Sequence, residues 1–318
     1  MSDRREKTLV KPDNVTLPAS FREPDSFYGA IGAFIVFAPI FFLIGTAPLL
    51  YQHVHPILVI FIIPMLGVYI YKITIVMHDC AHNTLFRGKA ANHLVGTIGG
   101  YFLGSDFEAF TANHFAHHRN YGVDGDPQGA DYLNLQGKGR HEILWHLLRP
   151  LVGYNLFKLW QFAPELPDGD TPKPSSPAAP PRRASRTKFV AGVLVVQGTI
   201  ALLATGFGAV PYLVVLYPLS AATFALFLSQ LRGFAEHVAD EGQPEESSVR
   251  THLPNLFDRF FFYHLNFNYH VEHHLYPYVP SCHLSEVHDL IKEKCHDDRT
   301  ISNSILLTVR RRIEACHK

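Results

Sequence analysis

The chain has 318 residues, in which 28 Lys and Arg balance 28 Asp and Glu, and 20 residues are histidine. A formal net charge of zero gives no support for a general nucleic-acid-binding surface, so no nucleic-acid partner is expected. The apolar content of 47% would suit a soluble protein of one or two domains, but the positions of the charged residues argue against that class.

Two long stretches, residues 26–71 and 189–231, contain no Asp, Glu, Lys or Arg. A helix needs roughly 20 residues to cross about 30 Å of hydrocarbon, so each stretch has room for two passes and a turn. Turn-forming Gly and Pro residues lie within 46–56 and 205–211. The sequence therefore predicts an all-α membrane protein with four transmembrane helices in two hairpins, near residues 29–51, 56–77, 189–206 and 210–231. Buried helices of a large soluble protein are the alternative.

The basic residues predict the orientation of these helices. All 28 Lys and Arg lie outside the two uncharged stretches, so the positive-inside rule places both termini and the central loop in the cytoplasm. We expect a multi-pass protein of the bacterial inner membrane or the endoplasmic reticulum. The expected segments are a cytoplasmic N-terminal segment 1–28, a first hairpin 29–77, a first cap segment 78–188, a second hairpin 189–231 and a second cap segment 232–318, all forming one catalytic domain.

The central loop contains three further features. The apolar, glycine-rich patch at 93–104 is too short to span a membrane, and is either re-entrant or packed under the cap. Residues 141–162 have the pattern of an amphipathic helix lying on the membrane surface. Residues 164–181 contain seven prolines and read as a solvent-facing linker. The four cysteines form no zinc-like pair, so free thiols are expected.

Three histidine clusters carry most of the chemical information: HDCAH at 78–82, HFAHH at 114–118 and HVEHH at 270–274. Positions i, i+3 and i+4 lie on one face of a helix, so the imidazoles of each cluster can converge. One first-row metal rarely takes more than about six ligands, and structural zinc takes four. Eight imidazoles therefore predict two metals. The expected ligands are His78, His82, His114, His117, His118, His270, His273 and His274.

Other polar residues near the clusters are candidates for supporting roles. His237, which follows the fourth predicted span, is a possible ninth ligand. Carboxylates next to the ligands can accept the outer ring N–H and so orient each imidazole, and Asn side chains could hold a metal-bound water or cap locally. These candidates are Asp79, Glu236, Glu272, Asn266 and Asn268. The segment containing Asp126 reads first as a turn.

The ligand type restricts the metal. Imidazole suits iron, zinc, copper and nickel, but an iron pair with open positions can reduce dioxygen, whereas zinc cannot. The HExxH motif of zinc proteases is absent from the sequence. Ligand type alone therefore leaves the choice among these metals open.

The boxes H-x3-H, H-x-x-H-H and H-x-x-H-H resemble the membrane fatty acid desaturase family over residues 29–280, both in their order and in the places of the four spans, two before the first box and two between the second and third. The phrase NYHVEHHLYPYVP is especially similar to the third box of that family. The resemblance implies a non-haem di-iron centre under a cytoplasmic cap, with the eight box histidines and His237 as ligands. It also implies O2-dependent desaturation of a fatty acyl or related lipid chain.

Two departures from the family pattern affect these expectations. The acyl-CoA branch places a water-holding Asn four residues before the extra histidine, where this chain has Gly233, so Asn266 or Asn268 would have to substitute. The haem-binding HPGG motif of fusion members is also missing, so electrons are expected from a separate ferredoxin or cytochrome b5-like protein. Two alternatives stay open: a carotenoid or lipid hydroxylase or ketolase of the same superfamily, and a membrane metal transporter. The transporter is disfavoured because its ligands would lie near the membrane midplane.

Overall fold

The computed structural model describes residues 15–121, 126–129, 135, 137–154, 186–237, 249–295 and 301–315. Within these ranges the protein is mainly helical, with one short parallel pair of strands, β1 (Thr251–His252) and β2 (Ile301–Ser302). Four helical segments are long and apolar enough to cross a membrane: Ala19–His53, Pro56–Ala81, Arg186–Ala204 and Pro211–His237. The four predicted spans are therefore confirmed as apolar helices of spanning length.

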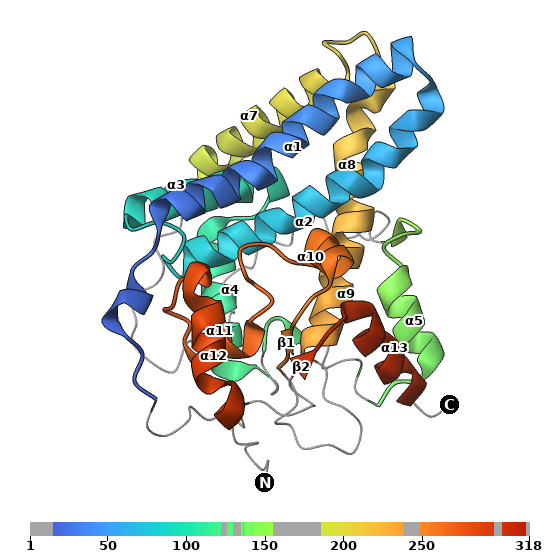
Figure 1. Ribbon diagram of the computed structural model, residues 1–318. Coiled ribbons are helices and arrows are strands. Elements are labelled where there is room, and N and C mark those ends of the chain that lie inside the picture. Colours follow the sequence, from blue (N-terminus) through green and yellow to red (C-terminus); the bar gives the residue numbers. More distant parts are fainter. Residues whose placement is uncertain are drawn as a thin grey trace.

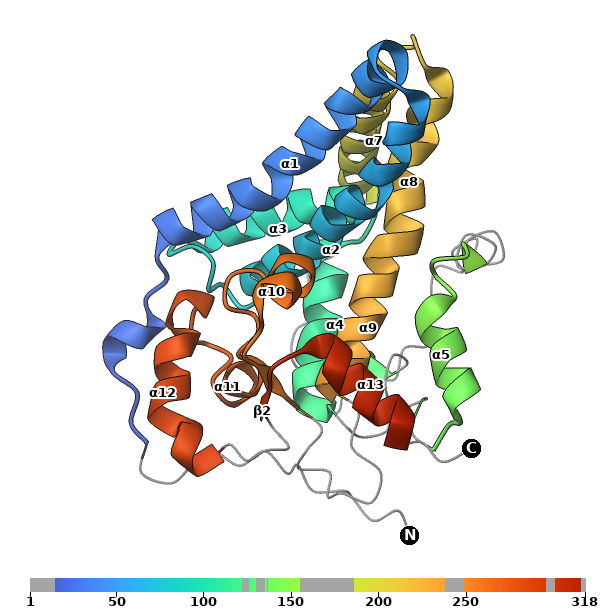
Figure 2. The same ribbon diagram turned by 45° about the vertical axis from the view of Figure 1, so that its right-hand side comes forward.

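The first two of these segments contain α1 (Ser26–His53) and α2 (Ile62–Ala81), which lie side by side (Figures 1 and 2). The Asp25 carboxylate accepts hydrogen bonds from the backbone N–H groups of Phe27 and Tyr28, which caps the start of α1. We expected a turn to begin near residue 46, but α1 continues through Pro48 to His53. An apolar environment favours this result, because a helix satisfies its own backbone groups where water cannot.

The third long segment is α7 (Arg186–Ala204), and a turn containing Gly206 and Gly208, both with positive φ, connects it to the fourth. The fourth consists of a short 3-10 turn, α8 (Leu216–Ser220), a π-helical turn at Ala221–Ala225 and α9 (Leu226–His237). The π-helical turn packs against α2 at Gly67, where a Cβ atom would lie only 2.5 Å from Cβ of Phe224. Glycine at position 67 therefore permits the closest approach of these two helices.

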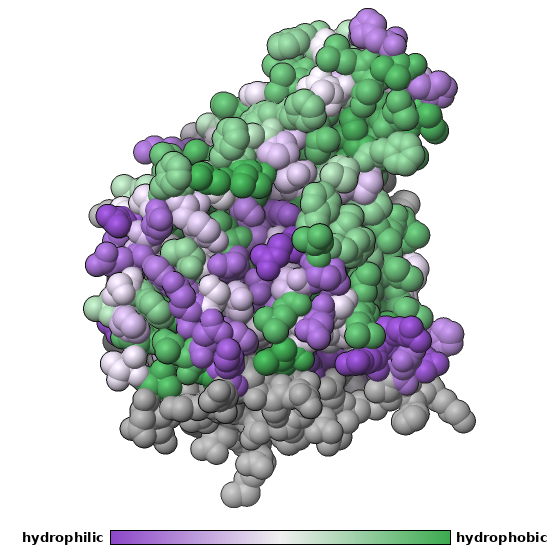
Figure 3. Space-filling model, in the orientation of Figure 1, coloured by the Kyte–Doolittle hydropathy of each residue, from purple (hydrophilic) through white to green (hydrophobic). Residues whose placement is uncertain are grey.

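The surfaces of these helices match the membrane prediction. Phe34, Phe42 and Val195 on α1 and α7 are each about 70% exposed, in a region where apolar side chains cover the molecule (Figure 3). Such a continuous apolar surface is uncommon on a soluble monomer. By contrast, α2 is buried along most of its length by α1, α3 (Lys89–Leu103), α9 and the π-helical turn. The most buried of the four helices thus leads directly into the first histidine cluster.

The shorter helices gather at one end of the long ones: α4 (Phe107–Asn120), α5 (Arg140–Leu148), α10 (Leu256–Phe262), α11 (His270–Leu275), α12 (Leu284–Cys295) and α13 (Ile305–Ala315). The apolar patch at 93–104 lies mostly within α3, which packs against α2 and α7 and ends at Gly104 with φ of 63°. The proline-rich segment lies outside the described residues.

One predicted helix is shorter than expected. The amphipathic pattern at 141–162 suggested a continuous helix, but α5 ends at Leu148 and the chain turns at 149–153. Pro150 accounts for the difference, because it lacks the N–H group that would continue the helical hydrogen-bond pattern. Residues 155–162 lie outside the described part of the chain.

Candidate metal centre

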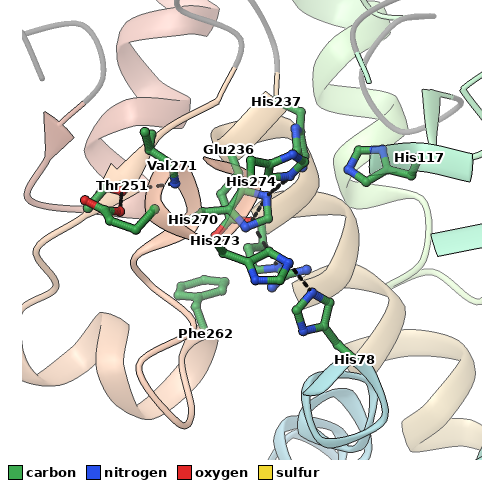
Figure 4. Close-up of polar contacts among 12 residues, drawn as sticks. His78, His117, Glu236, His237, Thr251, Phe262, His270, Val271, His273 and His274 are labelled. Carbon is green, nitrogen blue, oxygen red and sulfur yellow. Dashed lines mark hydrogen bonds and ion pairs between the residues drawn. The ribbon is translucent and has the colours of Figure 1, made fainter. Parts of the chain in front are cut away.

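Nine histidines from four helices lie close to one another at the end of the long helices. Figure 4 shows His78, His117, His237, His270, His273 and His274. Helix α2 ends with His78 and has His82 as its C-terminal cap, α4 carries the second cluster, α9 ends at His237, and α11 carries the third cluster. The helical spacing of each cluster predicted this convergence within each helix. The fold adds the convergence of the four helices with one another.

Five of the histidines form a first set, whose ring nitrogens lie within 4.8 Å of one another. Its members are His78, His82, His114, His118 and His273. The Nε2–Nε2 distances are 2.9 Å between His78 and His273, 2.8 Å between His82 and His114, and 3.0 Å between His118 and His273. Ligands at about 2.1 Å from a metal and at right angles to each other lie about 3 Å apart. The spacing therefore fits one six-coordinate metal with a remaining open position.

The other four histidines form a second set. His117, His237 and His274 have ring nitrogens within 4.8 Å of one another, and His270 Nε2 lies 2.9 Å from His237 Nε2 and 3.2 Å from His274 Nε2. The Glu236 carboxylate is also close, with Oε2 at 3.7 Å from His270 Nε2. The adjacent pairs 117/118 and 273/274 are each divided between the two sets, as expected for two neighbouring metals.

Burial keeps these imidazoles in the form that binds metal. Burial lowers the pKa of His82 to about 4, and burial together with neighbouring imidazoles lowers the pKa of His114, His270, His273 and His274 well below the usual value. A neutral imidazole has a free lone pair, which is what a metal ligand requires. Donor type, spacing and protonation state all fit two first-row metal ions.

Two carboxylates contact the Nδ1 atoms of two of the imidazole rings. Asp79 Oδ1 lies 2.9 Å from His78 Nδ1, and both carboxylate oxygens of Asp126 lie within 3.0 Å of His117 Nδ1. An ionised carboxylate can only accept, so Nδ1–H donates and the Nε2 lone pair of each ring faces the other histidines. Sequence reasoning treated Asp126 only as a turn residue. The sequence carries no periodic signal for the contact between Asp126 and His117, because these residues come together only in the folded chain.

Asp126→Asn is expected to lower the affinity for metal by about 10- to 100-fold while leaving the protein folded, because the amide no longer fixes the tautomer of His117. Titration of the metal-free protein with Fe(II), followed by the absorption of the loaded centre, would measure the change. Asp289→Asn is the matched control, since Asp289 is exposed and forms an ion pair with Lys292. Equal affinities for D126N and D289N would remove Asp126 from the centre.

The remaining predicted residues lie in different places. Glu272 is fully buried but faces away from the histidine sets: it contacts His288 Nδ1 at 2.6 Å and the Thr251 hydroxyl. The Asn268 amide donates to the backbone carbonyl of His252 at 2.8 Å, and Asn266 lies in a turn with φ of 57°. Among the described residues, the groups of His, Cys, Asp and Glu that could hold a metal ion do not include Glu272.

A cavity of about 170 Å³ opens directly onto the histidines. Its wall includes members of both sets, among them His78, His114, His237 and His270. The rest of the wall combines apolar with polar side chains: Thr74, Ile75, Phe110, Gln128, Ser229, Arg232 and Phe267, together with Gly233 and His117. Only a short segment of a lipid chain fits in this volume at one time, since pockets for whole small ligands usually measure about 300–1,000 Å³.

The fully buried His252 predicts a pH effect on stability. Burial, with help from the charges of Arg250 and Arg232, lowers the pKa of His252 to about 3. In the unfolded chain the value is about 6.5, so the unfolded state binds more protons between these values and stability decreases as the pH falls through this window. The metal-free protein in detergent should unfold at lower temperature at pH 5 than at pH 7, and His252→Asn should reduce this difference. Equal pH dependence in both proteins would contradict the assignment.

The long apolar helices and the histidine sets together define a class: a helical membrane protein with a histidine-rich site suited to two metal ions. The family comparison narrows that class. Residues 54–304 match the model of the family described as Fatty acid desaturase, and the chain belongs to this family. A search of curated proteins finds no match. The resemblance seen in the three histidine boxes is therefore confirmed at the level of the family.

Proposed function

We propose that this protein is an O2-dependent di-iron oxidoreductase that desaturates a fatty acyl or related lipid chain. The main support is the division of nine imidazoles into two sets of five and four, each with the spacing of metal ligands, in a member of the desaturase family. A bound iron pair would supply the capacity to reduce dioxygen and to oxidise an unactivated C–H bond. The proposed ligands are the eight box histidines and His237.

The protein's own residues would position the substrate and exclude water. The lipid segment would occupy the cavity, between Ile75 and Phe267 and next to both histidine sets. In the overall reaction the chain loses two hydrogen atoms, an external donor supplies two electrons and the solvent supplies two protons, and together these reduce O2 to two water molecules. We propose a separate ferredoxin or cytochrome b5-like protein as that donor.

The topology of the proposed enzyme follows the charge pattern. The long helices would form two membrane hairpins, and the shorter helices with the histidines would form a cytoplasmic cap, with both termini on that side. This arrangement would place the metals next to the lipid phase and within reach of a water-soluble electron donor. The segments 78–188 and 232–318 would make up the cap of one catalytic domain. A bacterial inner membrane and the endoplasmic reticulum both fit.

Metal analysis of detergent-purified protein, combined with lipid profiling of a host that expresses it, would test the proposal. We expect about two iron ions per chain and a new unsaturated lipid that requires O2. A preparation that retains one zinc and no iron would contradict the di-iron assignment. Oxygenated carotenoid with unchanged acyl unsaturation would instead favour the hydroxylase or ketolase alternative, and metal uptake without any oxidised product would favour a transporter.

A further inference from the structure

The wall of the cavity contains a guanidinium group whose donors are largely unused. Arg232 lies on α9, one turn before Glu236, and its side chain is 18% exposed where it lines the cavity. Among the described residues its Nε and Nη1 atoms are buried without a hydrogen-bond partner. The nearest carboxylate oxygen is Glu236 Oε2, at 3.5 Å from Nε, and the ring of Phe267 covers one face at 4.5 Å. These contacts balance the charge, and because Nε and Nη1 are inaccessible, Nη2 is the nitrogen that a ligand in the cavity can reach.

The surroundings of Arg232 make these donors significant. No Asp or Glu is among the described residues that line the cavity, whereas Ser229 and Gln128 add further polar groups to the wall. Covering a guanidinium with a purely hydrocarbon segment would strip its water without replacing the hydrogen bonds, which is unfavourable. The part of the substrate that meets Arg232 must therefore carry an acceptor. Arginine is well suited to a carboxylate or carbonyl oxygen, because its planar donors match those groups.

The distance from Arg232 to the metal ligands limits where this acceptor lies on the substrate. Glu236 Oε2 is 3.5 Å from Arg232 Nε and 3.7 Å from His270 Nε2, so the two nitrogens are no further apart than these distances together. Consecutive chain carbons are about 1.5 Å apart, so an extended segment of about six carbons spans this distance, and an acceptor at Arg232 places the reacting carbon near the oxygen-bearing end of the chain. The small volume of the cavity also favours a short separation between the acceptor and the reacting carbon.

We propose that Arg232 binds the acyl carboxylate or carbonyl oxygen of the substrate, so that the enzyme oxidises a C–H bond within about six carbons of that oxygen. This inference rests on the proposed function and narrows it to substrates oxidised near their oxygen-bearing end. Arg232 is thus a positioning residue, and Ser229 and Gln128 contribute smaller polar contacts.

Iron-loaded protein with a reducing partner would be given chains of equal length in three forms: the free fatty acid, its methyl ester and the corresponding alkane. For the wild type we expect oxidation near the acyl end of the acid or the ester, and the preferred form identifies whether the acceptor is a carboxylate or a carbonyl. The alkane should react poorly. Arg232→Gln should raise KM for the preferred form by about 10- to 100-fold and spread the position of oxidation, with little change for the alkane. Ser229→Ala should cause a smaller change in the same direction.

Two controls separate this inference from the proposed function. Iron content and the thermal shift caused by the free acid are measured for each variant, so loss of metal is not mistaken for loss of substrate binding. If Arg232→Gln loses iron, the wild-type oxidation position and Arg232→Lys, which keeps the charge but not the planar fork, provide the test. Oxidation in the middle of the chain, or unchanged KM and position in iron-loaded R232Q, would overturn the inference and leave the proposed function intact. A lack of O2-dependent product from every lipid would count against the proposed function itself.

Discussion

His273→Ala is expected to release iron from the first histidine set and to lower lipid oxidation by more than about 100-fold. The Nε2 atom of His273 lies 2.9 Å from that of His78 and 3.0 Å from that of His118, so this ring connects ligands from α2, α4 and α11. Loss of a group that merely orients a ligand already costs about 10- to 100-fold in affinity or activity, and loss of the ligand itself should cost more. Iron content, absorption spectrum and product formation would be measured together.

His93→Ala is the matched control for this variant. His93 is largely exposed, its Nε2 lies 2.9 Å from Glu108 Oε1, and it belongs to neither of the two histidine sets. We expect its iron content and turnover to equal those of the wild type. If H273A kept two iron ions and full turnover, the assignment of the first set would be wrong.

Glu272→Ala is expected to lower the free energy of unfolding by about 3 kcal/mol, because it leaves buried partners without their acceptor. The Glu272 carboxylate is fully buried and connects His288 on α12 with Thr251 on β1, and the Thr251 hydroxyl in turn accepts from the backbone N–H of Val271. Glu272→Gln keeps an acceptor and should lose less. Denaturant unfolding of metal-free protein in detergent would measure both changes.

The control for Glu272 is Glu286→Ala. Glu286 also pairs with a histidine, His283, at 2.9 Å, but its side chain is 53% exposed, so the expected change is within about 0.5 kcal/mol. A direct role of Glu272 at the metals would give a different pattern, with iron lost from E272A at unchanged stability of the metal-free protein. That pattern would contradict the structural role described for Glu272.

The sequence allowed prediction of the features that depend on local periodicity. Charge-free stretches indicated the four long helices, and the i, i+3, i+4 spacing indicated which imidazoles converge. The same rule explains Glu272: two residues after His270, it lies about 200° around the helix and so on the opposite face. Helical geometry alone therefore predicts that Glu272 points away from the metal ligands of the same helix.

Other features depend on contacts between distant segments and leave no periodic signal. The contact of Asp126 with His117 requires a particular path of the loop after α4. The contribution of His237 requires α9 to end beside α11 rather than anywhere else in the fold. The polar wall of the cavity, with Arg232 and Gln128 together, is assembled from helices and loops that are remote in sequence.

The π-helical turn at Ala221–Ala225 makes the protein sensitive to insertions and deletions, and not only to substitutions. It contains an additional residue relative to an α-helical turn, and each residue of an α-helix corresponds to about 100° of rotation. Deleting one residue there would leave every histidine in the sequence but turn Arg232 and His237 together away from the other ligands. This turn therefore sets the rotation of α9 about its own axis. Single-residue insertions or deletions between the turn and His237 should inactivate the enzyme as effectively as the loss of a ligand.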